Sequence, residues 1–326
     1  ALGRFLNQFS GYPDEAQVQL KLAKHYFDEG EFLRSQLMLA RIKEEMPHVD
    51  QGVQRALMAK ILMSNNLFEQ AAFLFHELSS EWSDEIVWDG KTGKELFDSV
   101  SPNAGLRVAV ERRDWPNGKV TADKGNGEQA FTGTYPPVKF VQRRGVLSAI
   151  TPPYIGYTNT NLTITNGSGR LVGRASIQRA GNVFISRTSQ SNMVQAHALG
   201  HLLVVSTGDE IFAVNTLGTV NRSRENVLWK IKASVAQPGQ RRTVSAKNAA
   251  HPWAGNRGRI VGPAVSNQLI GVVGPITPHG VCFTKNTNIV CVDPITGREQ
   301  WVHKNVGTGC DIFGDDEFIF VIRDRT

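Results

Sequence analysis

The chain contains only three cysteines in 326 residues, and all three lie after residue 280. Three cysteines are too few for a disulfide-stapled scaffold, and their spacing matches none of the common zinc-binding patterns. No apolar run reaches the roughly 18–20 residues that a membrane-spanning helix requires. Hydrophobic residues make up 40% of the chain and charged residues 20%, a balance typical of globular proteins with a buried core.

Acidic side chains dominate the first part of the chain and basic side chains the rest. Residues 1–100 contain 10 Lys and Arg against 16 Asp and Glu, a net charge of −6, whereas residues 101–326 contain 26 against 14, a net charge of +12. This asymmetry predicts different partners for the two parts, or attraction between them. The basic residues of the second part include Arg112, Arg113, Arg143, Arg144, Arg241, Arg242, Arg257 and Arg259.

A spacing of 36 residues relates two stretches within the first hundred residues. Small residues recur at Ala23 and Ala59, and again at Ser35 and Ala71. The apolar residues between them follow the 3–4 spacing of amphipathic helices. The pattern predicts four helices, near residues 14–28, 31–46, 52–64 and 68–81.

This arrangement of small, aromatic and turn residues resembles the tetratricopeptide repeat, which is a pair of helices about 34 residues long. Small residues at the helix crossings let paired helices approach closely, and aromatic side chains fill the space beside them. Two repeats are fewer than the three that such arrays usually need for stability. We therefore expect the helices to pack against another part of the protein, in preference to forming a peptide-binding groove.

Residues 84–135 carry weaker signals. Thr92 and Glu95 have the spacing of a capping box, which predicts a short helix near residues 93–99. Gly, Thr and Asn are frequent in residues 122–135, as in turns and loops. The predicted domains are a helical segment at 1–83, a connector at 84–135 and a strand-rich domain at 136–326.

From about residue 136 the sequence changes to runs of roughly 4–8 Val, Ile, Thr and aromatic residues, which Gly, Asn and Asp interrupt. The clearest unit extends from Val281 to Trp301. Its pattern predicts a strand, a turn at Asn286–Thr287, a second strand, a turn at Asp293–Gly297 and a third strand.

The end of this unit resembles the tryptophan-docking motif of PQQ-like, or quinoprotein-type, β-propeller repeats. The motif consists of a small residue, Asp, Thr, Gly and Trp, and its counterparts in this chain are Cys291, Asp293, Thr296, Gly297 and Trp301. Asp and Thr side chains can bond the backbone of a turn, Gly permits positive φ, and Trp can pack on the adjacent blade. The resemblance implies a β-propeller of four-stranded antiparallel blades in a bacterial protein.

The unit recurs twice in weaker form. Ala213 and Asn215 take the first positions of the motif, and Trp229 follows 14 residues after Asn215, where the clearest unit has a spacing of 8. The copy between Leu162 and Gly173 has no Trp. The predicted blades cover residues 136–180, 182–235 and 258–306, and a further pair of strands follows at 312–322.

Propellers close with about 4–8 blades. Three blades and the start of another therefore predict an incomplete ring, which a continuation of the chain or a second chain would close. Trp229 and Trp301 are expected to be buried between blades. Cys282 and Cys291 lie opposite each other if Asn286–Thr287 is the centre of a hairpin. They would form a cross-strand disulfide in an oxidising compartment, or remain small buried residues.

Quinoprotein dehydrogenases share the propeller, and the resemblance to them would imply a quinone, a Ca²⁺ ion, a catalytic Asp and often a disulfide between adjacent cysteines. Cys282, Cys291 and Cys310 are not adjacent, and no matching acidic set is present. We therefore predict no catalytic, cofactor-binding or metal-binding residues and no cofactor.

The favoured hypothesis is a non-enzymatic protein-interaction or scaffold protein of the bacterial periplasm or cell envelope. Its partner is expected to be a protein, which includes a second copy of the chain. A quinone- or metal-dependent oxidoreductase is the first alternative. A binder of nucleic acid or another polyanion through the basic part is the second, and it is disfavoured because the basic residues do not alternate with aromatic ones.

Overall fold

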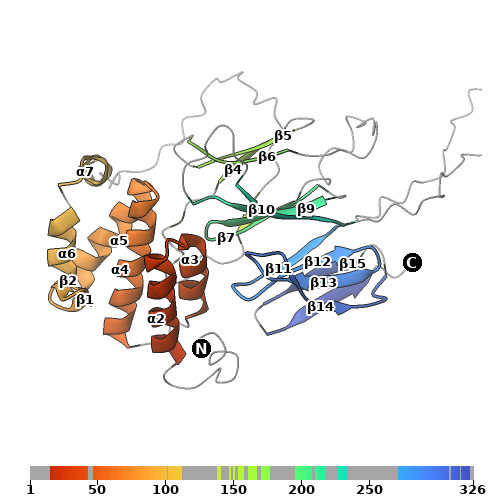
Figure 1. Ribbon diagram of the computed structural model, residues 1–326, viewed down its shortest axis with the longest axis horizontal. Helices are drawn as coiled ribbons and strands as arrows, with labels where there is room; N and C mark the ends of the chain where they lie inside the picture. The colour runs from red at the N-terminus through yellow and green to blue at the C-terminus, as the bar shows by residue number, and fades with distance from the viewer. Residues whose placement is uncertain are drawn as a thin grey trace, which may run out of the picture.

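The structure of the chain is a computed structural model. The described residues are 15–42, 47–100, 102–111, 138–140, 147, 150, 153–157, 161–166, 170–176, 195–207, 210–217, 226–233, 271–307, 310–315 and 317–323. Helices come first along the chain and antiparallel sheets follow, so the fold mixes α and β structure (Figure 1).

The first four helices of the described residues pack as two successive pairs, in the part of the chain where the periodicity predicts helices. They are α2 (Glu15–Asp28), α3 (Phe32–Arg41), α4 (His48–Ser64) and α5 (Phe68–Glu81). Ala23, Ser35, Ala59 and Ala71 are fully buried where the helices meet, and the Ser35 hydroxyl donates to the Ala23 carbonyl at 2.7 Å. Helix α4 begins four residues earlier than its pattern predicts. Pro47 directly precedes this helix, a place that suits Pro because the first helical turn needs no backbone donor there.

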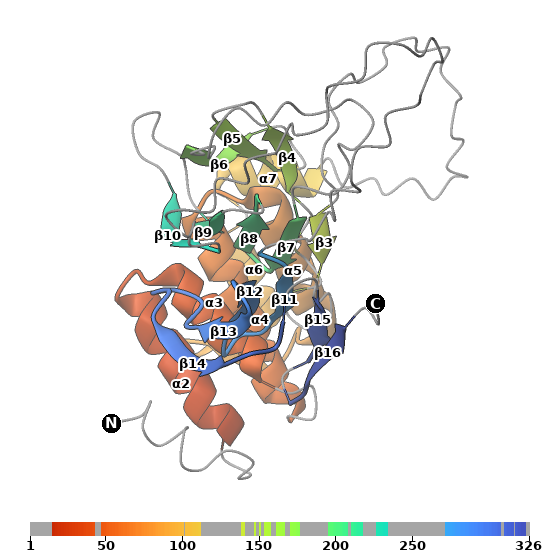
Figure 2. The same cartoon turned by 90° about the vertical axis from the view of Figure 1, so that its right-hand side faces the viewer.

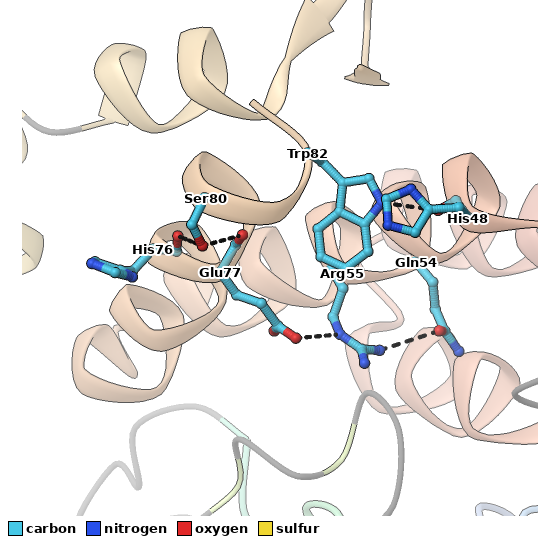
Figure 3. A network of polar contacts seen from close by, with 7 residues as sticks. All are labelled: His48, Gln54, Arg55, His76, Glu77, Ser80 and Trp82. Atoms are coloured by element: carbon cyan, nitrogen blue, oxygen red, sulfur yellow. Dashed lines mark hydrogen bonds and ion pairs between the residues drawn. The ribbon is translucent and has the colours of Figure 1, made fainter. Parts of the chain in front are cut away.

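Polar contacts fix α4 against α5 and the residues that follow it (Figure 3). Arg55 Nε donates to Glu77 Oε1 at 3.3 Å, and both side chains are at most 21% exposed. The Trp82 indole N–H donates to the His48 carbonyl at 2.9 Å, and the two rings stack with centroids 4.9 Å apart. These bonds tie the beginning of α4 to the end of α5.

The residues predicted as a connector begin with structure that belongs to the helical segment. They form β1 (Ile86–Trp88), β2 (Lys91–Thr92), α6 (Gly93–Val100) and α7 (Ala104–Glu111). The capping box is present, since the Thr92 N–H donates to Glu95 Oε2 at 2.9 Å and the Glu95 N–H donates to Thr92 Oγ1 at 3.2 Å. Helix α7 was not predicted, although Asn103 Oδ1 caps it by accepting from the N–H groups of Gly105 and Leu106.

Three sheets and a hairpin follow in chain order. The first sheet contains β4 (Tyr154–Tyr157), β5 (Asn161–Thr165) and β6 (Leu171–Ser176). The second has the order β10-β9-β8-β7-β3, with β3 (Val138–Phe140), β7 (Gln195–Leu199), β8 (Leu202–Ser206), β9 (Glu210–Asn215) and β10 (Val227–Lys232). The third contains β11 (Val273–Ile276), β12 (Val281–Lys285), β13 (Asn288–Val292) and β14 (Glu299–His303). The final hairpin contains β15 (Cys310–Gly314) and β16 (Ile319–Arg323).

The blade boundaries differ from the prediction at one strand. Strand β3 was assigned to the first blade, but it pairs in parallel with β7 at the edge of the second sheet, whereas the neighbouring pairs of the first and second sheets are antiparallel. A parallel pair needs a long connection, and the chain between β3 and β7, which includes the first sheet, provides one. Strand pattern alone does not reveal such a partner.

The sheets pack face to face in the order in which they occur along the chain, as propeller blades do (Figures 1 and 2). Strand β8 is buried on both faces. Leu202 and Val204 join the core shared with the helices, whereas Leu203 and Val205 pack towards the first sheet. The third sheet is packed towards the second on its inner face, through Phe283 and other apolar residues, and towards the final hairpin on its outer face. The described sheets do not form a closed ring.

The helical segment packs along one end of these sheets. One turn from each sheet contacts it: Arg170 donates to the Asn66 carbonyl at 3.1 Å, His201 bonds Gln36, and Arg41 donates to the Pro278 carbonyl at 2.9 Å. This confirms the expectation that the helices pack against the strand-rich domain. Among the described helices, none is long and apolar enough to cross a membrane.

Candidate interaction site

The turn at residues 293–297, between β13 and β14, connects three parts of the molecule. Asp293 Oδ1 accepts from the Thr296 N–H at 2.8 Å, the Thr296 hydroxyl at 2.9 Å and the Ile295 N–H at 3.1 Å. Gly297 has φ +66°, which a side chain would disfavour. A single carboxylate oxygen thus organises the turn.

Trp229 of the second sheet packs on this turn. Its indole N–H donates to the Pro294 carbonyl at 3.0 Å, and its ring stacks on Phe283 with centroids 6.4 Å apart. A Cβ on Gly297 would lie 2.6 Å from Trp229 Cγ, so only glycine leaves room for the indole. Trp229 lies opposite Ala213 in the sheet and is 8% exposed. The turn therefore joins the second sheet to the third.

Asn215 does not repeat the role of Asp293 in full. Its Oδ1 accepts from the Leu217 N–H at 2.9 Å, which matches one of the bonds of Asp293. The residues after Leu217 lie outside the described part of the chain until Asn226. Ala213, Asn215 and Trp229 share one strand pair of the second sheet.

Trp301 has the register of Trp229 but not its burial. It lies opposite Cys291, as Trp229 lies opposite Ala213, yet it is 40% exposed. The expectation that Trp301 is buried therefore does not hold for the described residues. The physical reason is that Trp301 lies on the outer face of the third sheet, where no described turn takes the place that 293–297 takes beside Trp229.

Further apolar side chains are exposed on the outer side of the third sheet, in the final hairpin. The rings of Phe313 and Phe320 stack with centroids 5.3 Å apart although both are about half exposed. Strand β16 is an edge strand among the described residues. We call the following set the outer apolar surface: Phe313, Phe318, Phe320 and Ile322, with exposed fractions of 48, 59, 49 and 54%.

The turn at 293–297 also borders a cleft against α2 and α3. The cleft has a volume of about 140 Å³, and Arg34 and Arg41 line it opposite Asp293. Sites for small organic ligands are typically about 300–1,000 Å³. The cleft is therefore too small for a cofactor of the quinone class and is better described as part of the junction between helices and sheets.

A buried histidine forms the second contact of that junction. The His201 backbone N–H donates to Gln36 Oε1 at 2.8 Å, and its Nδ1 lies 2.9 Å from Gln36 Nε2. Burial lowers the pKa of His201 to about 3, so the ring is neutral and Nδ1 accepts from the amide. Gly200 has φ +58°, and a Cβ there would meet Gln36 Oε1 at 2.7 Å. Gln36 thus packs against the turn at 200–201 so closely that position 200 has room only for glycine.

Two lysines of the helical segment converge on one tryptophan. Lys24 Nζ lies 4.7 Å and Lys60 Nζ 5.0 Å from the Trp88 ring centroid, and these lysines are one repeat spacing apart. Lys24 also pairs with Asp89 at 2.9 Å. Burial lowers the pKa of Lys60. This otherwise acidic segment therefore carries a local basic cluster over α2 and α4.

The cysteines are free thiols in the structure. Cys282 lies directly opposite Cys291 in the antiparallel register, and Cys282, Cys291 and Cys310 are all buried. The structure describes the reduced form of this pair, and the cross-strand disulfide that the sequence left open stays a prediction. Within the described ranges, no three His, Cys, Asp or Glu side chains gather as metal ligands. The basic residues at 112–113, 143–144, 241–242, 257 and 259 lie outside those ranges.

No family model and no curated protein matches the chain. Among solved structures, it is similar to the crystal structure of BamB from Moraxella catarrhalis, with 12% sequence identity and a TM-score of 0.25. The match covers 48% of this chain and 35% of that one, so the chain spans about a third of BamB. At this similarity neither a partner nor an activity follows from the likeness.

Proposed function

We propose that the chain is a non-enzymatic protein-interaction scaffold of the bacterial cell envelope. Propeller-like blades, held by a tetratricopeptide-like helical segment, present the outer apolar surface to a protein. The observation that carries this proposal is the exposure of four large apolar side chains on one face of the final hairpin, on the outer side of the third sheet. Exposed apolar residues are ordinary when scattered, but a group of aromatic residues is typical of a surface that binds another protein.

The chemistry of this surface suits a β-strand as its partner. Within the described ranges β16 pairs only with β15, so its other edge offers backbone N–H and C=O groups, and its apolar side chains offer area for burial. Addition of a strand supplies main-chain hydrogen bonds for affinity, and contacts to the side chains supply specificity. The partner is therefore a protein with an available strand, which includes a second copy of this chain. The resemblance of residues 291–301 to PQQ-like repeats supports a bacterial envelope.

The size of the assembly in the native host tests this function. We would express the chain with an affinity tag in its host, purify it at physiological salt and measure its mass by sedimentation velocity. The chain alone has a mass of 35.9 kDa, and a larger particle is expected. The double variant Phe313→Ser/Phe320→Ser should sediment as the chain alone, because two exposed rings that would be buried against the partner are removed.

The matched control is Ile86→Ser, which changes a side chain that is 61% exposed on β1, outside the outer apolar surface. It should leave the particle unchanged. A wild-type chain that sediments alone, or an assembly that survives the double variant, would reject the proposal. Circular dichroism of each variant shows whether the fold is intact.

A further inference from the structure

The pairing of Cys282 with Cys291 is of the kind that brings two side chains closest across a sheet. The hairpin register runs from Lys285–Asn288 at the turn to Cys282–Cys291. The Thr284 N–H donates to the Val272 carbonyl, before β11, and therefore points away from β13. Backbone N–H groups two residues apart in a strand point to the same side, so the Cys282 N–H also points away from β13. Cys282 and Cys291 therefore form a pair without mutual backbone hydrogen bonds.

Such pairs have Cα atoms about 4.5 Å apart, compared with about 5.5 Å for hydrogen-bonded pairs. Disulfides need Cα atoms about 4.4–6.8 Å apart and Cβ atoms about 3.5–4.5 Å apart. The typical Cα separation of such a pair therefore lies within the range that a disulfide needs, and the register of the third sheet can stay as it is. Cys310 is on β15, outside this strand pair.

The two thiols already interact. The Cys282 thiol is hydrogen-bonded to Cys291. This hydrogen bond and burial raise the pKa of Cys282, whereas the same hydrogen bond lowers the pKa of Cys291. Cys291 Sγ also lies 3.7 Å from the Oε1 atom of Gln300, an exposed residue of β14. Cys291 is thus the thiol closer to its anionic form, and it lies under a surface side chain.

We infer that Cys282 and Cys291 are a redox pair, which a disulfide oxidant converts into a cross-strand disulfide of the third sheet. The Cys291 thiolate attacks one sulfur of the oxidant, forms a mixed disulfide and releases one thiolate. Cys282 loses its proton and attacks Cys291 Sγ, which releases the second thiolate. The protein thereby loses two protons and two electrons, and the oxidant takes up both electrons as its disulfide becomes two thiols.

Oxidation would lock the strand that leads into the turn at 293–297. Cys291 is two residues before Asp293, so a bond from β12 to β13 fixes the start of the turn on which Trp229 packs. This inference concerns the pairing of β12 with β13 and does not rest on the proposed function.

The test is redox titration of the purified, reduced chain. The chain is equilibrated with mixtures of oxidised and reduced glutathione, free thiols are blocked with iodoacetamide, and tryptic peptides are analysed by mass spectrometry without reduction. Lys285 lies between the two cysteines, so trypsin leaves them on separate peptides that only a disulfide joins. We expect a Cys282–Cys291 linked pair that is about 2 Da lighter than the sum of the two free peptides, and an alkylated Cys310.

Three variants make the outcome decisive. Cys310→Ala should form the same linkage with the same midpoint, and Cys282→Ala should form no intramolecular linkage. Gln300→Ser should speed oxidation without moving the midpoint, because it uncovers Cys291 Sγ. Three alkylated cysteines at every glutathione ratio would overturn the inference, as would a linkage through Cys310.

Discussion

Trp229 and Trp301 occupy equivalent positions in successive sheets and have different surroundings. Each lies on the last strand of its sheet, opposite a small residue, Ala213 or Cys291. Trp229 is 8% exposed and bonds the Pro294 carbonyl, whereas Trp301 is 40% exposed. The sequence around a docking tryptophan therefore does not decide whether it is buried. The turn of the next sheet decides it, because that turn supplies the hydrogen-bond acceptor and the glycine.

The largest expected effect is that of removing the buried tryptophan. Trp229→Ala deletes an indole packed between Phe283 and the turn, together with its bond to Pro294, and should lower the free energy of unfolding by about 3–5 kcal/mol. Urea denaturation followed by circular dichroism measures this loss. A loss below about 1 kcal/mol would show that Trp229 does not hold the two sheets together.

A methyl group added to the turn at 293–297 tests the packing of Trp229 from the side of the turn. Gly297→Ala places a Cβ 2.6 Å from Trp229 Cγ at φ +66°, and should cost about 2–4 kcal/mol of stability from backbone strain and overpacking together. Gly30→Ala is the matched control, since Gly30 has φ +76° with open space around its Cβ position and should lose only the backbone share, about 1–2 kcal/mol. Thermal and urea unfolding of both variants measure the difference. Equal losses would mean that the indole does not press on Gly297.

The free energy of unfolding should also depend on pH, because His201 is buried at the junction between helices and sheets. Its folded pKa of about 3 lies below the ordinary value of 6.5, so the unfolded chain takes up a proton first as the pH falls. Stability from this group is complete above pH 6.5 and should decrease by about 1.4 kcal/mol per pH unit below it. His201→Gln should flatten the dependence between pH 6.5 and 5, measured by urea unfolding at each pH. An unchanged slope would contradict the buried neutral histidine.

The smallest effect is expected for the exposed tryptophan. Trp301→Ala should lower the free energy of unfolding of the isolated chain by about 1 kcal/mol, since the side chain keeps much of its contact with water in the folded state. The same urea series that measures Trp229→Ala measures this loss. A loss as large as that of Trp229→Ala would contradict the exposed position of Trp301.

The helices and strands were largely predictable from sequence because they depend on local periodicity. Helices α2 to α5 and the hairpin centred on Asn286–Thr287 lie close to the predicted positions. Partners distant in sequence were not predictable. The parallel pairing of β3 with β7 and the exposure of Trp301 depend on which segments meet in space. The Asn103 cap of α7 is a local signal that loop composition alone does not reveal.

The contact between helices and sheets at Gln36 and His201 was likewise not predictable from the sequence. Gln36 in the middle of an apolar helix face and His201 after a glycine carry no motif, yet they bond each other across 165 residues. Neither residue was predicted as a contact, because the sequence pattern assigns a polar residue on a helix to the solvent-facing side until its partner is known. Only the packing of α3 on the turn between β7 and β8 reveals the pair.

The most direct test of the proposed binding surface is photocrosslinking from it in living host cells. A benzophenone amino acid replaces Phe320, which is 49% exposed on β16, or Ile86, which is 61% exposed on β1. We expect a crosslink to one protein, identified by mass spectrometry, from position 320 and none from position 86. Equal crosslinking from both positions, or none from position 320, would contradict the claim that the outer side of the third sheet is where this protein binds its partner.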